Sequence, residues 1–195
     1  MSIPAVLSGD RVVLSKLRRE DVPVFAPHFQ NLELTSYLRG AGVAFSLEDE
    51  LAWFESVSRV QERSVTLGVY ERGTGRVVGV VDLRDVDHRQ GTAELGVCVF
   101  DPADWGSGFG SEATRLMVEY GVFHLGLQNV MLRVYAFNTR AIRSYEKVGF
   151  RTFGRRSGAV RLGAERFDLV FMEVTADRVD TSALRAQLRL LPPVE

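Results

Sequence analysis

The sequence predicts an α+β (mixed α/β) domain built on a largely antiparallel sheet that contains one parallel crossover. Two observations predict this class. In the first half of the chain, strand patterns follow one another across polar turns, and in the second half, strands alternate with amphipathic helices. The 195 residues include 46% hydrophobic and 25% charged side chains, the composition of an ordinary globular domain.

The first elements are expected to be a strand and two helices. Arg11–Leu17 combines apolar residues with polar borders, which is typical of a strand. Asp21 is placed to cap a short helix, and Ser46 is placed to begin a longer one. Apolar residues recur at helical spacing after Ser46: Leu47, Leu51, Phe54 and Val57.

A hairpin is expected next. Val65–Tyr70 and Val77–Val81 read as strands on either side of a polar loop that contains two glycines. Arg84–Gly91 is polar and reads as a connection. Thr92–Phe100 then forms the fourth strand, which Pro102 ends because proline has no N–H for a sheet ladder.

The second half alternates helices and strands. A helix follows the glycine-rich segment 106–110 and is expected to stop at Gly126. Val130–Ala136 reads as the fifth strand, and Asn138–Val148 as a short helix that ends at Gly149. A single parallel crossover results, because the helix after the fourth strand carries the chain across to the fifth.

A last hairpin and a terminal helix complete the expected elements. Phe150–Arg155 and Arg166–Glu173 form the hairpin, with its turn at Ser157-Gly158. Ser182–Leu191 reads as a short amphipathic helix. Its apolar stripe needs a surface to cover, and we expect a homodimer, with packing of the stripe on its own domain as the alternative. The stripe is formed by Leu184, Leu188 and Leu191.

Composition excludes several function classes. The formal net charge is −1, with 24 basic and 25 acidic residues, so no electrostatic argument favours nucleic acid or an anionic membrane. Cys98 is the single cysteine, and three histidines without paired spacing predict no metal site. The first residues show no secretory signal pattern, and we expect a cytoplasmic protein.

The strongest chemical signal is the glycine loop Gly106–Gly110 between a strand and a helix. Such a loop brings backbone N–H groups close to a ligand, and the helix N-terminus favours a phosphate. A P-loop would need a lysine, which Gly110-Ser111-Glu112 lacks, and Ser111 breaks the GxGxxG dinucleotide fingerprint. A coenzyme A pyrophosphate loop remains, with a glycine-rich turn that binds no ligand as the alternative.

Two flanking segments give the loop a family context. Ala93–Pro102 and Asn138–Phe150 resemble motifs A and B of the GNAT acetyltransferases, and Trp105–Ala113 looks like the RimJ/RimL subgroup. The resemblance implies the GNAT fold, with about seven strands, a splayed fourth and fifth strand and flanking helices. It also implies a domain over residues 1–176, followed by a tail over 177–195.

The resemblance further implies how acetyl-CoA, as co-substrate, is held. The backbone of Cys98, Val99 and Phe100 would face the pantetheine amides, and Asn138 would contact the same arm. The family often has Gln or Arg where Trp105 stands, and tryptophan there is familiar in the subgroup. The pyrophosphate would lie on the loop: Gly106, Ser107, Gly108, Phe109, Gly110 and Ser111.

Two residues are candidates for proton transfer. Glu94 stands where the family often has a general base, and the alternative is a strand carboxylate paired with an arginine. A second base position used in the family is occupied by Arg133, which accepts no proton. Tyr145 could protonate the departing thiolate, or simply anchor its helix. Cys98 reads as a small buried hydrophobe.

Together these features predict an N-acetyltransferase that moves an acetyl group directly from acetyl-CoA to a primary amine. The acceptor is left open among a protein N-terminus, a polyamine and a small-molecule amine. A domain that binds acyl-CoA without turnover is the alternative, and the broken fingerprint disfavours an oxidoreductase. The acceptor side is expected to be built by Asp21–Gly42, Ser46–Arg63 and the last hairpin.

Overall fold

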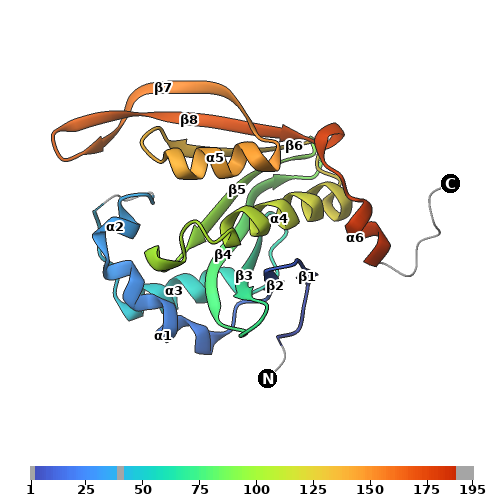
Figure 1. Cartoon of the computed structure of the whole chain (residues 1–195), viewed down its shortest axis with the longest axis horizontal. Coiled ribbons are helices and arrows are strands. Elements are labelled where there is room, and N and C mark those ends of the chain that lie inside the picture. The colour runs from blue at the N-terminus through green and yellow to red at the C-terminus, as the bar shows by residue number, and fades with distance from the viewer. Residues whose placement is uncertain (1–2, 39–41, 188–195) are drawn as a thin grey trace.

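The computed structural model describes residues 3–38 and 42–187 and contains one eight-stranded sheet. The strand order is β1-β2-β3-β4-β5-β6-β8-β7 (Figure 1). Every neighbouring pair is antiparallel except β5 and β6, so the single parallel crossover is confirmed. The strands are β1 Leu7–Ser8, β2 Val12–Ser15, β3 Val65–Glu71, β4 Val77–Asp87, β5 Thr92–Val99, β6 Asn129–Tyr135, β7 Arg151–Leu162 and β8 Glu165–Thr175.

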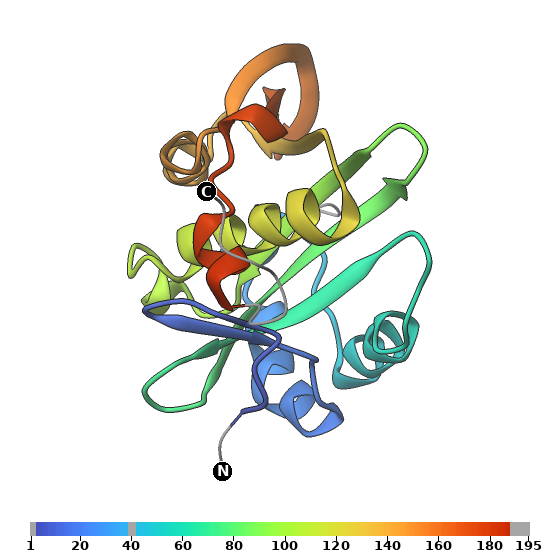
Figure 2. The ribbon, with the colours of Figure 1, turned by 90° about the vertical axis from the view of Figure 1, so that its right-hand side faces the viewer.

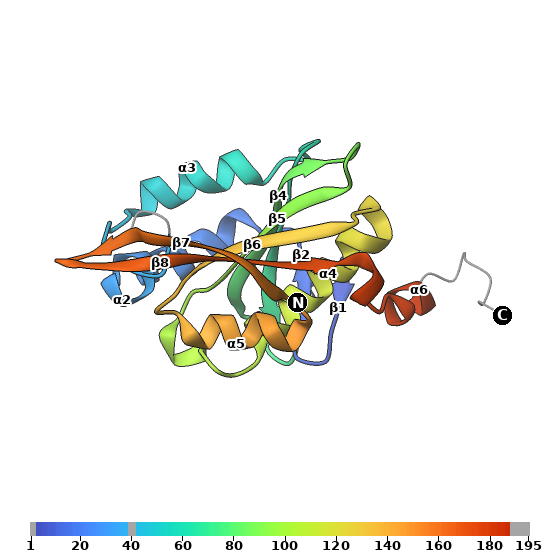
Figure 3. The same ribbon diagram turned by 90° about the horizontal axis from the view of Figure 1, so that it is seen from above.

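Helices cover both faces of the sheet. Figure 3 shows α3 on one side of the strands and α4 and α5 on the other. The α-helices are α1 Val22–Phe25, α2 Leu32–Thr35, α3 Leu47–Val57, α4 Phe109–Leu125, α5 Thr139–Val148 and α6 Ser182–Gln187. Short 3₁₀ turns are η1 Arg19–Asp21, η2 Ala26–Gln30, η3 Pro102–Asp104 and η4 Ala176–Arg178.

Two hydrophobic cores hold these layers together. The larger core lies between α4 and the sheet, where Ala113 and Met117 are fully buried against strand residues such as Leu83 and Leu132. The smaller core lies on the opposite face, where Phe25 of α1 stacks on Phe100 with ring centroids 4.5 Å apart. Close packing on both faces keeps the middle of the sheet rigid.

The central strands separate after a short parallel contact. β5 pairs with β6 only where residues 92–94 meet residues 129–131. Beyond that point β5 stays with β4 as far as Val99, while β6 stays with β8 as far as Tyr135 (Figure 1). The predicted splay of the fourth and fifth long strands is therefore confirmed, and it opens a slot in the sheet.

Local signals in the sequence fix three helix ends. Ser46 and Asp49 form a reciprocal capping box at the start of α3, as the placement of Ser46 predicts. Gly126 and Gly149 end α4 and α5 in the left-handed conformation, with φ values of 68° and 108°. Both glycines act as predicted, because residues with a Cβ atom disfavour this backbone region.

The predicted position of the last turn is wrong. β7 continues through Gly158, and the chain reverses at Gly163, where φ is 61°. Ser157-Gly158 instead lies in an irregularity of the β7–β8 pairing, where the Asp168 carboxylate accepts a hydrogen bond from the Gly158 N–H at 3.1 Å. A residue pair that contains glycine suits a bulge as readily as a turn, and the pairing with the neighbouring strand decides between them.

Two further expectations need correction. The polar stretch that starts at Arg84 is not a loop throughout, because β4 runs to Asp87 and Arg84 pairs across the sheet with Glu94. Asp21 makes no side-chain cap for α1. Its buried carboxylate accepts hydrogen bonds from Arg18 and from the Tyr70 hydroxyl, the latter at 2.6 Å. The eighth strand, beyond the expected seven or so, is the two-residue β1.

The C-terminal helix packs on its own domain. Figure 2 shows α6 beside α4, and Leu184 is only 5% exposed within the larger core. Leu188 and Leu191, the rest of the predicted stripe, lie outside the described residues. Leu184 thus covers part of its own domain, and the homodimer and the boundary at residue 176 stay predictions. No described helix is long and apolar enough to cross a membrane.

Candidate active site

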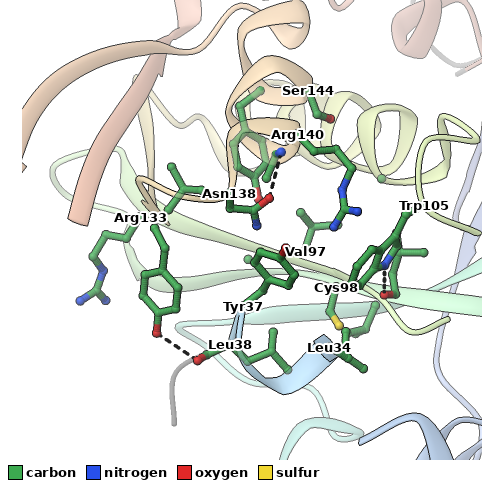
Figure 4. Close-up of a pocket in the computed structure, with 18 of the residues that line it drawn as sticks. Leu34, Tyr37, Leu38, Val97, Cys98, Trp105, Arg133, Asn138, Arg140 and Ser144 are labelled. Carbon is green, nitrogen blue, oxygen red and sulfur yellow. Dashed lines mark hydrogen bonds between the residues drawn. The ribbon is translucent and has the colours of Figure 1, made fainter. Parts of the chain in front are cut away.

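A cavity of about 1360 Å³ occupies the slot between β5 and β6 (Figure 4). The loop after β5 and helix α5 line one end. Helix α2, helix α3 and the β7–β8 hairpin line the other. The segments expected to bind the acceptor and those expected to bind coenzyme A thus border one continuous space.

The loop between β5 and α4 has a backbone shaped for an anion. Gly106 and Gly108 adopt φ values of 86° and 90°, and α4 begins with Gly108 as its N-cap. In the described part of the chain, the N–H groups of residues 109–111 have no hydrogen-bond partner. Unpaired amides and the positive end of a 17-residue helix together favour a phosphate. Ser107 does not line the cavity, and its carbonyl accepts a hydrogen bond from Arg11.

One face of α5 adds cations that the sequence reading missed. Arg140, Arg143 and Lys147 line the cavity at intervals of three and four residues. The Arg140 guanidinium lies over the Trp105 ring, 3.7 Å from its centroid, and so joins α5 to the loop (Figure 4). The helical spacing was visible in the sequence, but the crossing of α5 over the loop was not.

The strand edge that faces the slot differs in part from the expected one. Phe100 does not line the cavity, because its N–H donates to Val78 on β4 and its ring is buried in the smaller core. Cys98 shares that backbone orientation, since alternate residues of a strand point the same way. Val99 faces the slot, although its carbonyl accepts from the Trp105 indole at 3.0 Å. Val97, which the sequence reading missed, faces it as well.

Tyr145 and Asn138 both reach the cavity from α5. Burial, and then the charge of the Cys98 thiolate, raise the pKa of Tyr145 to about 12, so its phenol stays protonated at neutral pH. The ring also packs on Phe150, with centroids 6.0 Å apart, so anchoring and proton donation are compatible. The Asn138 carbonyl caps α5 by accepting from Ala141 at 3.2 Å, which leaves its amide for the cavity.

Glu94 is held by arginines. Its two carboxylate oxygens accept hydrogen bonds from Arg133, at 3.1 and 2.6 Å, and Arg84 lies 3.3 Å from one of them. This geometry is the arginine-paired alternative that the sequence left open. Arg133, which occupies the second base position of the family, is the partner that fixes the Glu94 carboxylate. Glu94 as the general base stays a prediction, and the geometry favours a structural ion pair.

The Cys98 side chain stays a protonated thiol and is therefore unsuited to act as a nucleophile. Burial, followed by the negative charges of Glu50 and Asp82, raises the pKa of the Cys98 thiol to about 12. The thiolate is the reactive form of cysteine, and at neutral pH it is nearly absent here. The side chain packs with the smaller core, which agrees with its reading as a small hydrophobe.

An aromatic cluster lines the cavity where the segment after α2 meets the loop between β5 and α4. Tyr37, just after α2, packs edge to face on Trp105 at 5.5 Å and against Phe137 at 5.7 Å. The Tyr135 hydroxyl donates to the Leu38 carbonyl at 3.0 Å, and this bond ties β6 to the segment after α2 (Figure 4).

The site agrees with what comparison with known proteins shows. Residues 11–151 match the model of the acetyltransferase (GNAT) domain family. The chain belongs to the GNAT acetyltransferase family. It is an N-acetyltransferase like its named relatives, which confirms the acyltransferase activity that the resemblance to this family implies. Among the described residues no cluster of histidine, cysteine and carboxylates could hold a metal ion.

Three similar proteins illustrate the GNAT relationship. The N-acetyltransferase p20 of Bacillus licheniformis is 25% identical over 150 residues, which are 76% of this chain and 83% of p20. The spermidine N(1)-acetyltransferase of Escherichia coli K12 is 32% identical over 80 residues, 41% of this chain and 42% of that enzyme. The crystal structure of spermidine N-acetyltransferase from Vibrio cholerae, in complex with CoA and spermine, has a TM-score of 0.76 at 19% identity. That match covers 88% of this chain and 99% of the other, and it supports the GNAT fold alone.

Proposed function

We propose that this GNAT protein transfers the acetyl group of acetyl-CoA directly to the primary amine of a small cationic molecule. The observation that carries the proposal is the slot through the sheet, which has an anion-binding loop at one end and carboxylates at the other. Acetyl-CoA entering from the loop side and an amine entering from the carboxylate side would meet between β5 and β6. No covalent enzyme intermediate is needed, and Cys98 is unsuited to form one.

Coenzyme A fits the loop side. Its pyrophosphate would lie on the free amides of residues 109–111, and Arg143 and Lys147 would add cations to a loop that has none of its own. The pantetheine arm would run along Val97 and Val99. When bound, acetyl-CoA supplies an activated acyl group, and Tyr145 is the buried phenol placed to donate a proton to the thiolate that leaves.

A cationic amine fits the acceptor side. Asp49, Glu50 and Asp82 line that part of the cavity, and opposite charge attracts an ammonium group in a partly desolvated site. Relatives named spermidine N-acetyltransferases support this class. The RimJ/RimL subgroup, the homodimer and the cytoplasmic location stay predictions.

An amine screen tests the proposal. Purified protein is mixed with acetyl-CoA and with spermidine, lysine or a short peptide that has a free N-terminus, and released thiol is measured. We expect amine-dependent release, fastest with spermidine or a similar small cation. Preference for the peptide would contradict the acceptor class. Binding of acetyl-CoA with no release for any amine would instead identify a binding module without turnover.

A further inference from the structure

Five carboxylates line the cavity within the described part of the chain. They come from α3, β4, β5 and the loop before α4: Asp49, Glu50, Asp82, Glu94 and Asp104. A carboxylate that is committed to a helix cap or an ion pair is poorly placed to take a proton from a substrate. The partners of each one therefore decide which can act on an acceptor.

Two of the five are fixed by a helix cap or by an ion pair. Asp49 accepts hydrogen bonds from the Ser46 N–H at 2.8 Å and the Ser46 hydroxyl at 2.9 Å, and these bonds form the capping box of α3. The two carboxylate oxygens of Asp104 accept hydrogen bonds from the two terminal nitrogens of Arg76, at 2.7 and 2.9 Å. Both carboxylates hold the walls of the cavity in place.

Two more are paired with arginines on the same strand or on a neighbouring strand. Asp82 lies 3.2 Å from the Arg84 guanidinium. Glu94 accepts from Arg133 at 2.6 Å and lies 3.3 Å from Arg84. Both carboxylates therefore stay close to fixed positive charges.

Glu50 is different from the other four. It is only 6% exposed, yet it lines the cavity and makes no side-chain hydrogen bond or ion pair within the described residues. The capping box orients the first turn of α3, and Phe54, one turn later, is buried in the smaller core. Glu50 lies on that same inner face, because residues four apart share one side of a helix. Its charge raises the pKa of the Cys98 thiol, so it lies within electrostatic range of the slot.

We propose that Glu50 is the general base that deprotonates the acceptor amine. This role rests on the proposed acetyltransferase function. The ammonium group gives one proton to the Glu50 carboxylate and becomes a neutral amine. The nitrogen forms its bond to the acyl carbon as the carbon–sulfur bond breaks, and the sulfur leaves with the electron pair. Tyr145 supplies the thiolate with a proton, and the second proton of the original ammonium returns to the tyrosine through solvent. Glu50 releases its own proton to solvent.

The environment of Glu50 suits a base at neutral pH. Burial, and then the neighbouring Asp49 charge, raise the pKa of Glu50 to about 7. The other ionisable groups of the cavity wall nearby are Asp82 and Arg84 on β4 and Cys98 on β5. His28 lies on η2, which packs against α3, but it does not line the cavity. A carboxylate with this pKa is ionised in a useful fraction and still binds a proton strongly.

The pH dependence of kcat/KM tests the role. Wild-type protein, Glu50→Gln and the control Glu48→Gln are compared from pH 5.5 to 9.5 with acetyl-CoA and the best amine of the screen. Glu48 is exposed on the same helix, outside the cavity. We expect a rising limb with an apparent pKa near 7 in the wild type and in Glu48→Gln. In Glu50→Gln this limb should disappear and turnover should fall by about 10²-fold or more.

The outcomes separate the two proposals. Affinity for coenzyme A, measured by calorimetry, should be unchanged in Glu50→Gln, because the loop that holds the pyrophosphate is on the other side of the slot. A Glu50→Gln protein that keeps the rising limb and more than about a third of wild-type turnover would overturn the role of Glu50 and leave the acetyltransferase function intact. A wild-type protein that releases no thiol with any amine would overturn both.

Discussion

At the scale of single residues, the two groups that we propose for proton transfer come from opposite faces of the sheet. Tyr145 packs against the larger core on the α4 side, whereas Glu50 belongs to α3 on the other side. Cys98 lies between them and is affected electrostatically by Glu50, while Cys98 in turn raises the pKa of Tyr145. The proposed acid and base thus approach the slot from opposite directions, one toward the leaving thiolate and the other toward the acceptor amine.

Removal of the Tyr145 hydroxyl tests the acid. Tyr145→Phe keeps the ring contact with Phe150 and removes only the proton donor. We expect turnover to fall by about 10²–10⁴-fold with little change in affinity for coenzyme A. Since burial holds the pKa of Tyr145 near 12, no loss of activity from its ionisation should occur below about pH 10.

A matched control is Tyr120→Phe, because Tyr120 lies on α4 and does not line the cavity. Its turnover should stay at the wild-type value. A coenzyme A thiol, with a pKa of about 8.5, leaves fairly well without help. If Tyr145→Phe keeps more than about a third of wild-type turnover while chemistry limits the rate, Tyr145 is an anchor and positioning by the cavity suffices.

At the scale of elements, the loop and the start of α4 act as one unit. Gly108 ends the loop and is the N-cap of the helix, with a φ of 90° that valine does not adopt. A Cβ atom at Gly108 would contact only the Arg11 side chain, at 3.5 Å, so backbone strain and not a clash decides the effect. A substitution there must therefore move the free amides.

Gly108→Val should lower affinity for coenzyme A by at least about tenfold, which is about 1.4 kcal/mol. Gly126→Val is the matched control, because Gly126 ends the same helix with φ at 68° and has no atom within 4 Å of a Cβ. Both variants carry similar backbone strain, of roughly 1–2 kcal/mol, but only the first distorts the loop. Calorimetry on both folded variants checks this, and equal affinities would refute the loop assignment.

At the scale of the whole molecule, Glu50 links folding to pH. Burial raises its pKa in the folded state from 4.5 to about 7. A raised folded pKa means that the folded protein binds the proton more tightly than the unfolded chain does. The resulting stabilisation is full below about pH 4.5 and is lost as the pH rises through about 7. Above that range, an unpaired buried charge opposes folding.

Glu50→Gln should remove this dependence. At pH 8.5 its Tm should exceed that of the wild type by about 2–4 °C, the shift that roughly 1 kcal/mol produces in a chain of this size once screening by cavity water is allowed for. Near pH 5 the two Tm values should converge. Calorimetric scans across this range provide the measurement, with Glu48→Gln as the exposed control. A difference that does not change with pH would mean that Glu50 is not desolvated.

Much of the fold can be predicted from the sequence because the signals that specify it are local. Ser46, Gly126 and Gly149 mark helix ends through their own backbone and side-chain chemistry, and the alternation of strands and helices gave the single parallel crossover. The turn predicted at Ser157-Gly158 is wrong because a residue pair that contains glycine suits a turn and a bulge equally. The pairing of β7 with β8 decided in favour of the bulge.

The sequence by itself determined the family, the loop and the identity of Tyr145 as a candidate acid, because each depends on residues close together in the chain. Only the tertiary structure decided how the carboxylates differ. Glu94 meets Arg133 from another strand, 39 residues away, whereas Glu50 meets no partner at all within the described residues. Ion pairing and burial depend on contacts between distant segments, and they determine which carboxylate is available to accept a proton.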